Sequence, residues 1–332
     1  MESFERPHPL TFVVMDGDRD AATGTRPAAR CGVDAPGRSD GSLMTVHVRP
    51  IGTDDVPATA EFLHVNLNAR VSPDAWARAM QVPWAGSQPN HGFLLAEKRS
   101  DAESVVGVYL AFYSERIIAG KAERFCNLGA WCVLPSHRFG GIRLLKALLA
   151  QPGYTFTDLS PSGAVVPLNQ RLNFTFLDTT TALMPNLPWP SWPGRSRIIT
   201  DASVIRATLS GADLQRYLDH ERAAAARHVL LVKDGRHCHV IFRRDRRKRV
   251  PLFASILYVS DTVLFHEMAR PLARHLLLRH GVVATLAEER IVGGRPKLSV
   301  LVPDTRRKMF KSANLRADQI DNLYSELVCV SW

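Results

Sequence analysis

The sequence of 332 residues has no apolar run approaching the ~18 residues that a membrane-spanning helix needs. Its first residues, MESFERPHPLTFVVMDGDRD, lack the basic start and the small-residue cleavage site of a secretory signal peptide. Its five cysteines form no CxxC pair and no Cys/His cluster with zinc-site spacing, and their odd number argues against a disulfide framework. We therefore expect a soluble, cytoplasmic protein without a structural metal or disulfides.

Two common nucleotide-binding patterns are also missing, because the sequence contains neither a GxxxxGK[ST] loop nor a GxGxxG fingerprint. The composition is otherwise that of a globular protein, with 45% hydrophobic and 22% charged residues, and the length suffices for two domains. The formal net charge of +10 favours an anionic partner, such as a phosphorylated cofactor, a nucleic acid or an acidic membrane surface.

Composition divides the chain into four segments. Residues 1–43 are rich in Gly, Pro, Ala, Arg and Asp and show no apolar period, which predicts a disordered leader. Residues 44–184 and 200–332 contain alternating strand and helix patterns and are predicted to be two domains. Residues 185–199 begin with PNLPWPSWPGR, in which the prolines prevent a helix or strand from continuing, so we expect a linker there.

The first predicted domain has strand patterns at residues 92–98, 105–115, 125–134 and 154–160. Between the last two strands lies a loop with two glycines, followed by IRLLKALLAQ, which has helical spacing. In the second domain the run 250–289 repeats this strand, helix and strand order, and LYSELVCV near the C-terminus is predicted to be a closing strand. The sequence thus predicts two copies of one α+β fold.

The glycine loop is the segment that points to chemistry. In GAWCVLPSHRFGGIRLLKALL, a strand ends in a loop that leads into the first turn of a helix, where unpaired amides and the positive end of the helix dipole suit a pyrophosphate. Arg138 and Arg143 flank the loop and add charged donors for phosphate oxygens. The structural alternative is a helix start at which Gly140 and Gly141 only permit close packing.

At these residues the chain from about 45 to 178 resembles a GNAT-family acyl-CoA N-acyltransferase. The family signature, Gln/Arg-x-x-Gly-x-Gly/Ala, reads here as RFGGIR over 138–143, with an arginine at the last place, so most of the signature is kept. The family's Lys-Leu-Gly-Phe turn reads as RLNF over 171–174. Asn173 replaces the glycine of that turn, as suits a position with positive φ. The resemblance implies that coenzyme A is held by the loop, by an open strand edge and by a helix residue. These positions are Trp131, Cys132, Val133, Arg138, Phe139, Gly140, Gly141, Ile142, Arg143 and Asn169.

The sequence departs from the family at both usual catalytic positions. A carboxylate base on the fourth strand would fall near Asn127, and the tyrosine that protonates the leaving thiolate would fall on Asn169. Amine attack can still proceed when orientation supplies much of the rate and water removes the proton. The candidate substitutes are Glu115 at the end of a strand, Asp158 at the end of another and His137 in the loop.

The second predicted copy lacks the phosphate loop, because it reads VSDTVL at residues 259–264, with no glycine and with Asp261 in place of an arginine. We therefore expect a degenerate, structural repeat. A separate basic run, RRDRRKR at residues 243–249, could bind nucleic acid, but no aromatic residue interleaves it as in single-strand binders. A solvated hairpin connection is the favoured interpretation of that run.

The sequence as a whole predicts tandem GNAT-like folds, each a mixed, mostly antiparallel sheet flanked by helices. The predicted activity is transfer of an acyl group, taken to be acetyl, from acyl-CoA to the amine of an unidentified acceptor by direct attack in a ternary complex, without a metal. The alternative is a noncatalytic GNAT-like binding or regulatory module, favoured by the amides at Asn127 and Asn169. A nucleic-acid-associated protein is the third interpretation.

Overall fold

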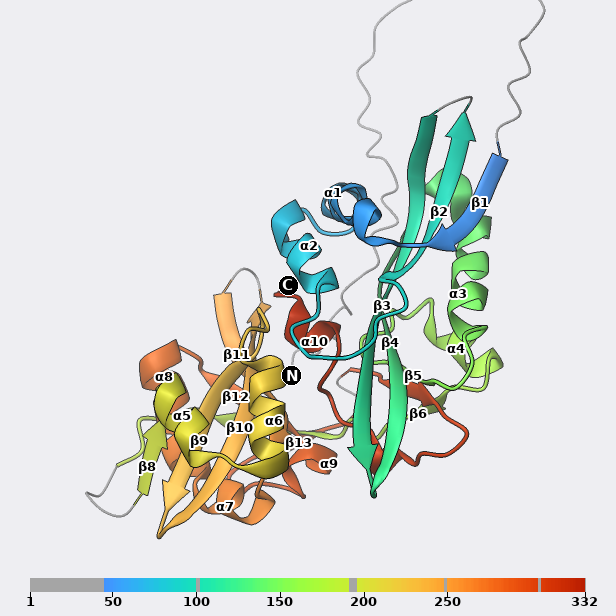
Figure 1. The fold of residues 1–332 in the computed structure, drawn as a ribbon. Coiled ribbons are helices and arrows are strands. Elements are labelled where there is room, and N and C mark those ends of the chain that lie inside the picture. Colours follow the sequence, from blue (N-terminus) through green and yellow to red (C-terminus); the bar gives the residue numbers. More distant parts are fainter. Residues whose placement is uncertain (1–44, 100–101, 191–195, 248–249, 304–305, 332) are drawn as a thin grey trace, which may run out of the picture.

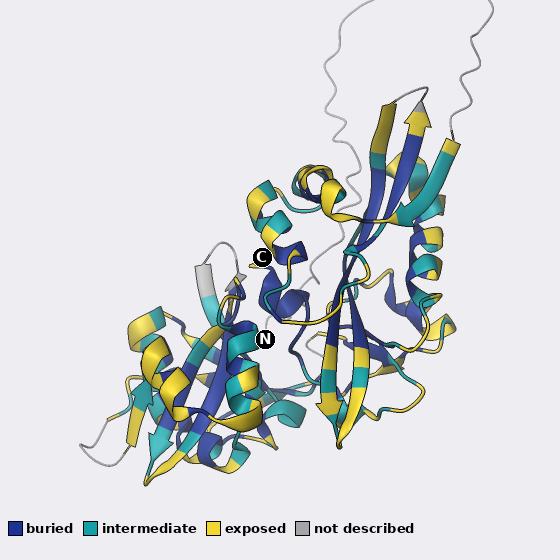
Figure 2. Cartoon of the chain, in the orientation of Figure 1, coloured by how far each residue is buried: buried dark blue, intermediate teal, exposed yellow. Residues whose placement is uncertain are grey.

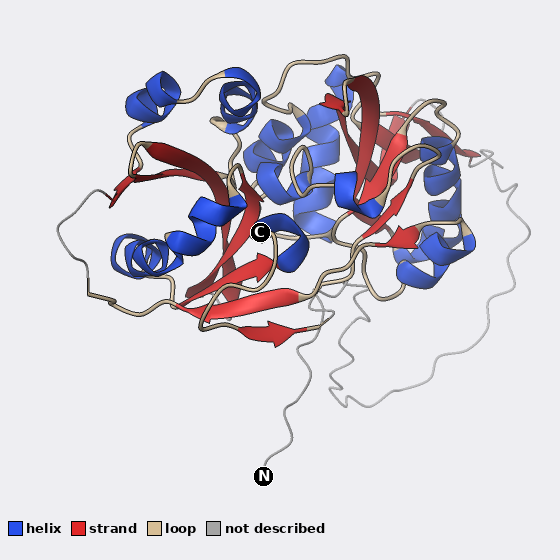
Figure 3. Ribbon diagram, turned by 90° about the horizontal axis from the view of Figure 1, so that it is seen from below, coloured by secondary structure: helices blue, strands red, loops and turns tan. Residues whose placement is uncertain are grey.

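The computed structural model describes residues 45–99, 102–190, 196–247, 250–303 and 306–331. The predicted leader at 1–43 and part of the predicted linker lie outside these ranges. Within them the chain forms two sheets that lie side by side, with helices packed around each (Figures 1 and 3). This confirms the predicted α+β class with two mixed, mostly antiparallel sheets. None of the helices within these ranges is long and apolar enough to cross a bilayer.

The first sheet has the strand order β1-β2-β3-β4-β5-β14-β6. Its strands are β1 (Thr45–Pro50), β2 (Gly92–Arg99), β3 (Ala102–Ile118), β4 (Lys121–Val133), β5 (Thr155–Asp158), β14 (Met309–Lys311) and β6 (Thr175–Phe176). Its helices are η1 (Thr53–Asp55), α1 (Val56–Asn66), α2 (Pro73–Met80), η2 (Pro135–Gly140), α3 (Gly141–Leu149) and α4 (Val166–Arg171). β4 and β5 pair in parallel, whereas the other neighbouring pairs are antiparallel.

Both faces of the first sheet are covered, and β3 carries only apolar residues and one glycine over residues 105–113. In β3, Leu110 and Phe112 belong to the core that α1 and α2 form. Tyr109 and Tyr113, which alternate with them, belong to the core on the opposite face, against α3 and α4. The alternation of side chains along one strand therefore builds two separate hydrophobic layers. In Figure 2 the colour of buried residues runs along the middle of β3 and β4.

The second sheet has the order β13-β7-β12-β11-β10-β9-β8. Its strands are β13 (Val300–Val302), β7 (Thr181–Pro185), β12 (Ala284–Glu288), β11 (Val250–Val259), β10 (Arg236–Arg247), β9 (Arg227–Lys233) and β8 (Ser196–Ile199). Its helices are α5 (Ala202–Thr208), α6 (Gly211–His220), α7 (Thr262–Glu267), α8 (Ala269–His280) and α9 (Glu289–Val292). The β9–β10 hairpin turns at Asp234 and Gly235, which both have positive φ.

The two sheets have equivalent strand orders, except that each contains one strand from the other half of the sequence. β14 lies between β5 and β6 of the first sheet, and β7 lies between β12 and β13 of the second. The two strands thus occupy matching places and are exchanged between the halves. β7 crosses the boundary predicted at residue 184 and pairs in the second sheet. The division of the chain into two domains stays a prediction.

The C-terminal segment, residues 306–331, returns to the first sheet. It contains η3 (Ala317–Gln319) and α10 (Glu326–Cys329), and α10 lies between the two sheets (Figure 1). The prediction of a closing strand in LYSELVCV is wrong. Ser325 accepts the amide of Leu327 and begins a short helix there, and all eight residues of the segment are buried. A wholly buried apolar run has no exposed face, so its periodicity cannot distinguish strand from helix.

The prediction that the basic run at residues 243–249 is a solvated connection is wrong for Arg243 and Asp245, which are both buried. β10 continues through Arg247, and Arg243 is 3% exposed. Arg243 forms an ion pair of 2.9 Å with Asp245, and its Nη1 donates to the carbonyl oxygen of Leu327 at 2.8 Å. Arg243 is therefore an anchor of the C-terminal segment. Residues 248–249 lie outside the described residues.

Candidate active site

The sheet splits at the end of β5. β4 pairs with β5 from Phe125 to Leu128, after which β5 ends at Asp158 while β4 continues to Val133. In the part of the chain that the structure describes, Gly129–Val133 have no strand partner on that side. The backbone edge of β4 is thus open over five residues, next to the carboxyl end of a parallel strand.

A bulge in β4 lies at this split. Val108 pairs with Cys132 and Leu110 with Gly129, so Ala130 and Trp131 both oppose Tyr109. Ala130 takes up the extra length with a φ of 52°, which non-glycine residues rarely adopt. Bulges re-aim backbone groups and side chains, and here the bulge coincides with the open edge.

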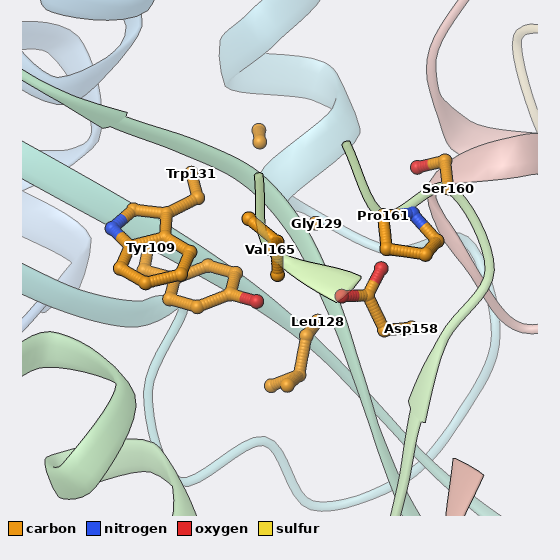
Figure 4. A pocket seen from close by; sticks show the side chains of 9 residues that line it. Tyr109, Leu128, Gly129, Trp131, Asp158, Ser160, Pro161 and Val165 are labelled. Atoms are coloured by element: carbon orange, nitrogen blue, oxygen red, sulfur yellow. The ribbon is translucent and has the colours of Figure 1, made fainter. Parts of the chain in front are cut away.

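A pocket lies in the split (Figure 4). On the β3 and β4 side it is lined by Tyr109, Leu128, Gly129, Ala130 and Trp131. On the β5 side it is lined by Asp158, Ser160, Pro161 and Val165. The rings of Tyr109 and Trp131 stack with centroids 4.6 Å apart and an interplanar angle of 9°, which fixes the wall next to the bulge.

Asp158 is the carboxyl side chain among the residues that line this pocket. It is 4% exposed, and burial raises its pKa to about 7, with a further rise from the nearby Glu326 carboxylate. Asn169 Nδ2 donates to Asp158 Oδ2 at 2.9 Å, which opposes part of that rise. Asn169 Oδ1 is buried without a hydrogen-bond partner among the described residues. Asp158 can therefore bind or release a proton near neutral pH.

A second buried carboxylate reaches the site from the C-terminal segment. Glu326, at the start of α10, is fully buried and accepts hydrogen bonds from Asn127 Nδ2 and, at 2.6 Å, from Ser160 Oγ. Burial raises the pKa of Glu326, while these hydrogen bonds lower it. Sequence reasoning missed Glu326 because it is 199 residues from Asn127, and no local pattern connects the two.

The glycine loop forms η2 and the first turn of α3, close to the open edge of β4. A Cβ atom on Gly140 would lie 2.5 Å from Leu95 Cδ2, and one on Gly141 would lie 3.2 Å from Trp131 Cζ2. Both glycines have φ values in the helical region, so they are needed for close approach and not for backbone freedom. The packing alternative therefore accounts for part of the Gly-Gly sequence.

The side chains of the loop face solvent. Arg138 and Arg143 are exposed, and Phe139 is 90% exposed, which is unusual for a large apolar residue. Arg143 Nη1 donates to the carbonyl oxygen of Val46 at 3.1 Å, which holds the guanidinium between β1 and α3. Ile142, on the same turn, packs against the core of the α3 face. Two cations thus stand at the N-terminus of α3.

The structure does not bring two of the predicted catalytic residues to the pocket. Glu115 is exposed and pairs with Arg124 six residues along β3 from Tyr109, about 20 Å away at the rise of a strand. His137 lies in η2, where its Nε2 is 3.3 Å from Glu97 Oε1 and its Nδ1 is 2.9 Å from Ser136 Oγ. The carboxyl groups at the pocket are those of Asp158, which lines it, and Glu326, which is bonded to Ser160 in its lining.

In the second half, the helix start that corresponds to the glycine loop is capped by a side chain of the protein itself. Asp261 caps α7 by accepting the amide of Leu264 at 2.9 Å, where the first half has Gly140 and Gly141. A carboxylate at a helix N-terminus satisfies the amides and the dipole that would attract a phosphate. No group of three or more His, Cys, Asp or Glu side chains in the described ranges is arranged to hold a metal ion.

Other proteins of known structure share this architecture. A conserved protein from Enterococcus faecalis V583, described as a probable N-acyltransferase, has a TM-score of 0.51 at 13% identity, over 83% of this chain and 74% of the other. A GCN5-related N-acetyltransferase from Anabaena variabilis has a TM-score of 0.52 at 10% identity, over 80% and 72%. No protein-family model and no curated protein matches the sequence. The chain has the GNAT fold.

The GNAT fold gives the RLNF turn a structural explanation. Asn173 has a φ of 62°, as predicted from its replacement of the family's glycine, and the amide of Phe174 then bonds the carbonyl oxygen of Asn169 at 3.0 Å. This turn ends α4 and fixes Asn169 beside Asp158. The two elements on which the resemblance rested therefore lie on either side of the split in the first sheet.

Proposed function

We propose that the first sheet binds an acyl-CoA, in the first instance acetyl-CoA, and transfers its acyl group to an amine. The observation that carries this proposal is the split between β4 and β5, with an open strand edge, a bulge and a buried carboxylate at one place. The GNAT fold supports it, because the solved neighbours above are described as N-acyl- or N-acetyltransferases.

The residues present fit such a cosubstrate. The amides of Phe139 to Arg143 that are not already bonded would hold the pyrophosphate, with Arg138 and Arg143 as charged donors. The amide of Gly141 donates instead to the carbonyl oxygen of Arg138. The open edge at Trp131, Cys132 and Val133 would pair with the amides of the pantetheine arm. Each group offers the donors or acceptors that the corresponding part of the molecule needs.

The pocket is small, with a volume of about 20 Å³, which favours a short acyl group over a long one. Tyr109, Leu128 and Val165 supply an apolar wall, and the stacked Trp131 closes one side. Backbone amides at the bulge would polarise the thioester carbonyl in a site that excludes most water. Asp158, whose pKa of about 7 allows it to be protonated near neutral pH, can return a proton to the leaving thiolate.

The noncatalytic alternative is favoured by one specific observation. Asn127 and Asn169 are amides at the two positions where the family resemblance places a base and an acid. Asp158 in the pocket favours the enzyme, because a binding module has no need of a carboxyl group buried at such a cost. Acetyl-CoA binding without thiol release in the presence of amines is the result that would select the noncatalytic module.

Calorimetric titration with acetyl-CoA tests the proposal. Wild type is compared with Arg138→Glu/Arg143→Glu, which reverses both exposed charges without altering the packing of the glycines. The matched control, Arg197→Glu/Arg222→Glu, makes the same change of net charge on exposed residues of the second half. We expect the first pair to weaken binding at least about tenfold, more at low salt, and the control to have little effect. Absence of binding by wild type refutes the proposal.

A further inference from the structure

Glu326 supplies a proton acceptor next to Asn127, whose own amide side chain cannot usefully accept a proton. Its carboxylate accepts Asn127 Nδ2, so it adjoins the position on β4 where a GNAT base is expected. A Cβ atom on Gly129 would lie 3.2 Å from Glu326 Cβ, so the absence of a side chain at Gly129 admits Glu326 against β4. The C-terminal segment therefore brings a carboxylate to the first sheet through contacts that only the exchanged topology provides.

Ser160 connects this carboxylate with the pocket. Ser160 is exposed and lines the pocket, directly after the end of β5 (Figure 4). Its hydroxyl donates to Glu326 Oε1 at 2.6 Å, and its backbone amide bonds the carboxyl group of Asp158. A hydroxyl group has one donor and two acceptor sites, so Ser160 can accept a proton from the pocket side while donating to Glu326.

We propose that Ser160 and Glu326 form a proton relay for acyl transfer, with Ser160 as the catalytic residue and Glu326 as the positioning residue behind it. The proposal rests on the function proposed above. As the amine nitrogen forms its bond to the thioester carbon, an N–H proton passes to Ser160 Oγ and the hydroxyl proton of Ser160 passes to Glu326 Oε1. The carbon–sulfur bond breaks, the thiolate leaves with its electron pair and takes a proton from Asp158 or water. Glu326 then returns its proton to solvent through Ser160, and Asp158 regains from solvent the proton that it gave, so both carboxyl groups return to their starting state.

The surroundings of Glu326 set when it can accept a proton. Burial raises its pKa, and the charge of Arg243 on β10 lowers it, together with the hydrogen bonds from Asn127 and Ser160. The other titratable groups coupled to it are Asp158 on β5, Tyr109 on β3 and Cys329 on its own helix. Because Asp158 and Glu326 repel each other when ionised, the site favours one protonated and one ionised carboxyl group near neutral pH.

A purely structural role for Glu326, as an anchor of the C-terminal segment, makes different predictions. Glu326→Gln keeps the shape and can still bond Ser160 and Asn127, but it accepts no proton. Ser160→Ala removes an exposed hydroxyl and leaves the packing of α10 intact. Asp321→Asn is the matched control, because Asp321 lies in the same segment and pairs with Arg116 at 2.7 Å, away from the pocket.

The assay follows thiol release from acetyl-CoA with methoxyamine, a small amine that is neutral between about pH 5.5 and 9, over that range. In wild type, kcat rises with pH on the acidic limb as Glu326 ionises, and it falls again above about pH 7 as Asp158 loses the proton that it gives to the thiolate. Ser160→Ala and Glu326→Gln each lower kcat about 100-fold or more and abolish that rise, while the Kd for acetyl-CoA stays within about twofold. The double variant loses no more than either single variant, because the two groups act in series. Asp321→Asn retains the wild-type pH profile.

Three outcomes overturn the relay. The first is a wild-type pH profile in Glu326→Gln, and the second is a double variant whose losses multiply. The third is a wild type that binds acetyl-CoA but does not accelerate thiol release over buffer. Failure of wild type to bind acetyl-CoA is separate, since it refutes the proposed function itself. Should Glu326→Gln fail to fold, Ser160→Ala still decides, because the relay requires its hydroxyl.

Discussion

Two buried methionines, Met309 in β14 and Met184 in β7, lie in the strands that are exchanged between the sheets, so substituting them tests the exchange. Met309 comes late in the sequence, yet it is fully buried in the core between the first sheet and α3, opposite Asp158 on β5. Met184 comes before β8 to β13, yet it is 4% exposed in the core of the second sheet, opposite Thr285 on β12. Replacing either by alanine therefore removes contacts from the sheet that the other half of the sequence builds.

The magnitude follows from burial. A buried Met→Ala substitution costs about 2 to 5 kcal/mol, because the lost transfer free energy adds to the cost of the cavity. At a factor of ten for each ~1.4 kcal/mol, the equilibrium constant for opening the affected sheet rises about 30-fold or more. We expect Met309→Ala to lower amide protection more in β5 than in β12, and Met184→Ala to do the reverse.

Hydrogen exchange under native conditions, read in peptides that cover β5 and β12, measures this difference. Met268→Ala is the matched control, because Met268 is 1% exposed in the second core and belongs to that half of the sequence. Met268→Ala should lower amide protection more in β12 than in β5, as expected for Met184→Ala. Loss of protection chiefly in β12 for Met309→Ala, and chiefly in β5 for Met184→Ala, would refute the strand exchange.

Three further predictions concern buried groups. Because burial raises the pKa of Asp158 to about 7, its ionisation destabilises the fold as the pH rises from about 4 to 7. Asp158→Asn should then equal wild type at about pH 4 and exceed its stability by a few kcal/mol at about pH 8, measured by urea unfolding. Lys308→Met should cost about 1 to 3 kcal/mol in the same assay, because it removes the buried ammonium group that pairs with the half-buried Glu288, which keeps its ion pair with Arg290; an unchanged midpoint contradicts this. Gly129→Ala should cost about 1 to 3 kcal/mol and raise the exchange rate of α10, since its Cβ meets Glu326 and Phe112; unaltered exchange in α10 counts against that contact.

Much of the first sheet follows from local sequence. The strand patterns that contain Leu94, Leu110 and Leu128, the two-glycine helix start and the positive φ of Asn173 are predictions that the structure confirms. Each depends on residues that are neighbours in the chain, so periodicity and backbone sterics suffice to reveal it. Asp158 was found as a candidate for the same reason, because it ends a strand in sequence as well as in space.

The sequence by itself determined most of the element types, the α+β class and the glycine loop, because these depend on spacings of a few residues. Only the tertiary structure decided that β7 and β14 change places, that Arg243 is buried and that Glu326 stands beside Asn127. These contacts join residues that are far apart in the chain, and their stability comes from burial and pairing in the folded state. Burial and long-range pairing leave no local period or motif in the sequence. The carboxylate of Glu326 can therefore be recognised as a candidate for proton transfer only in the folded chain.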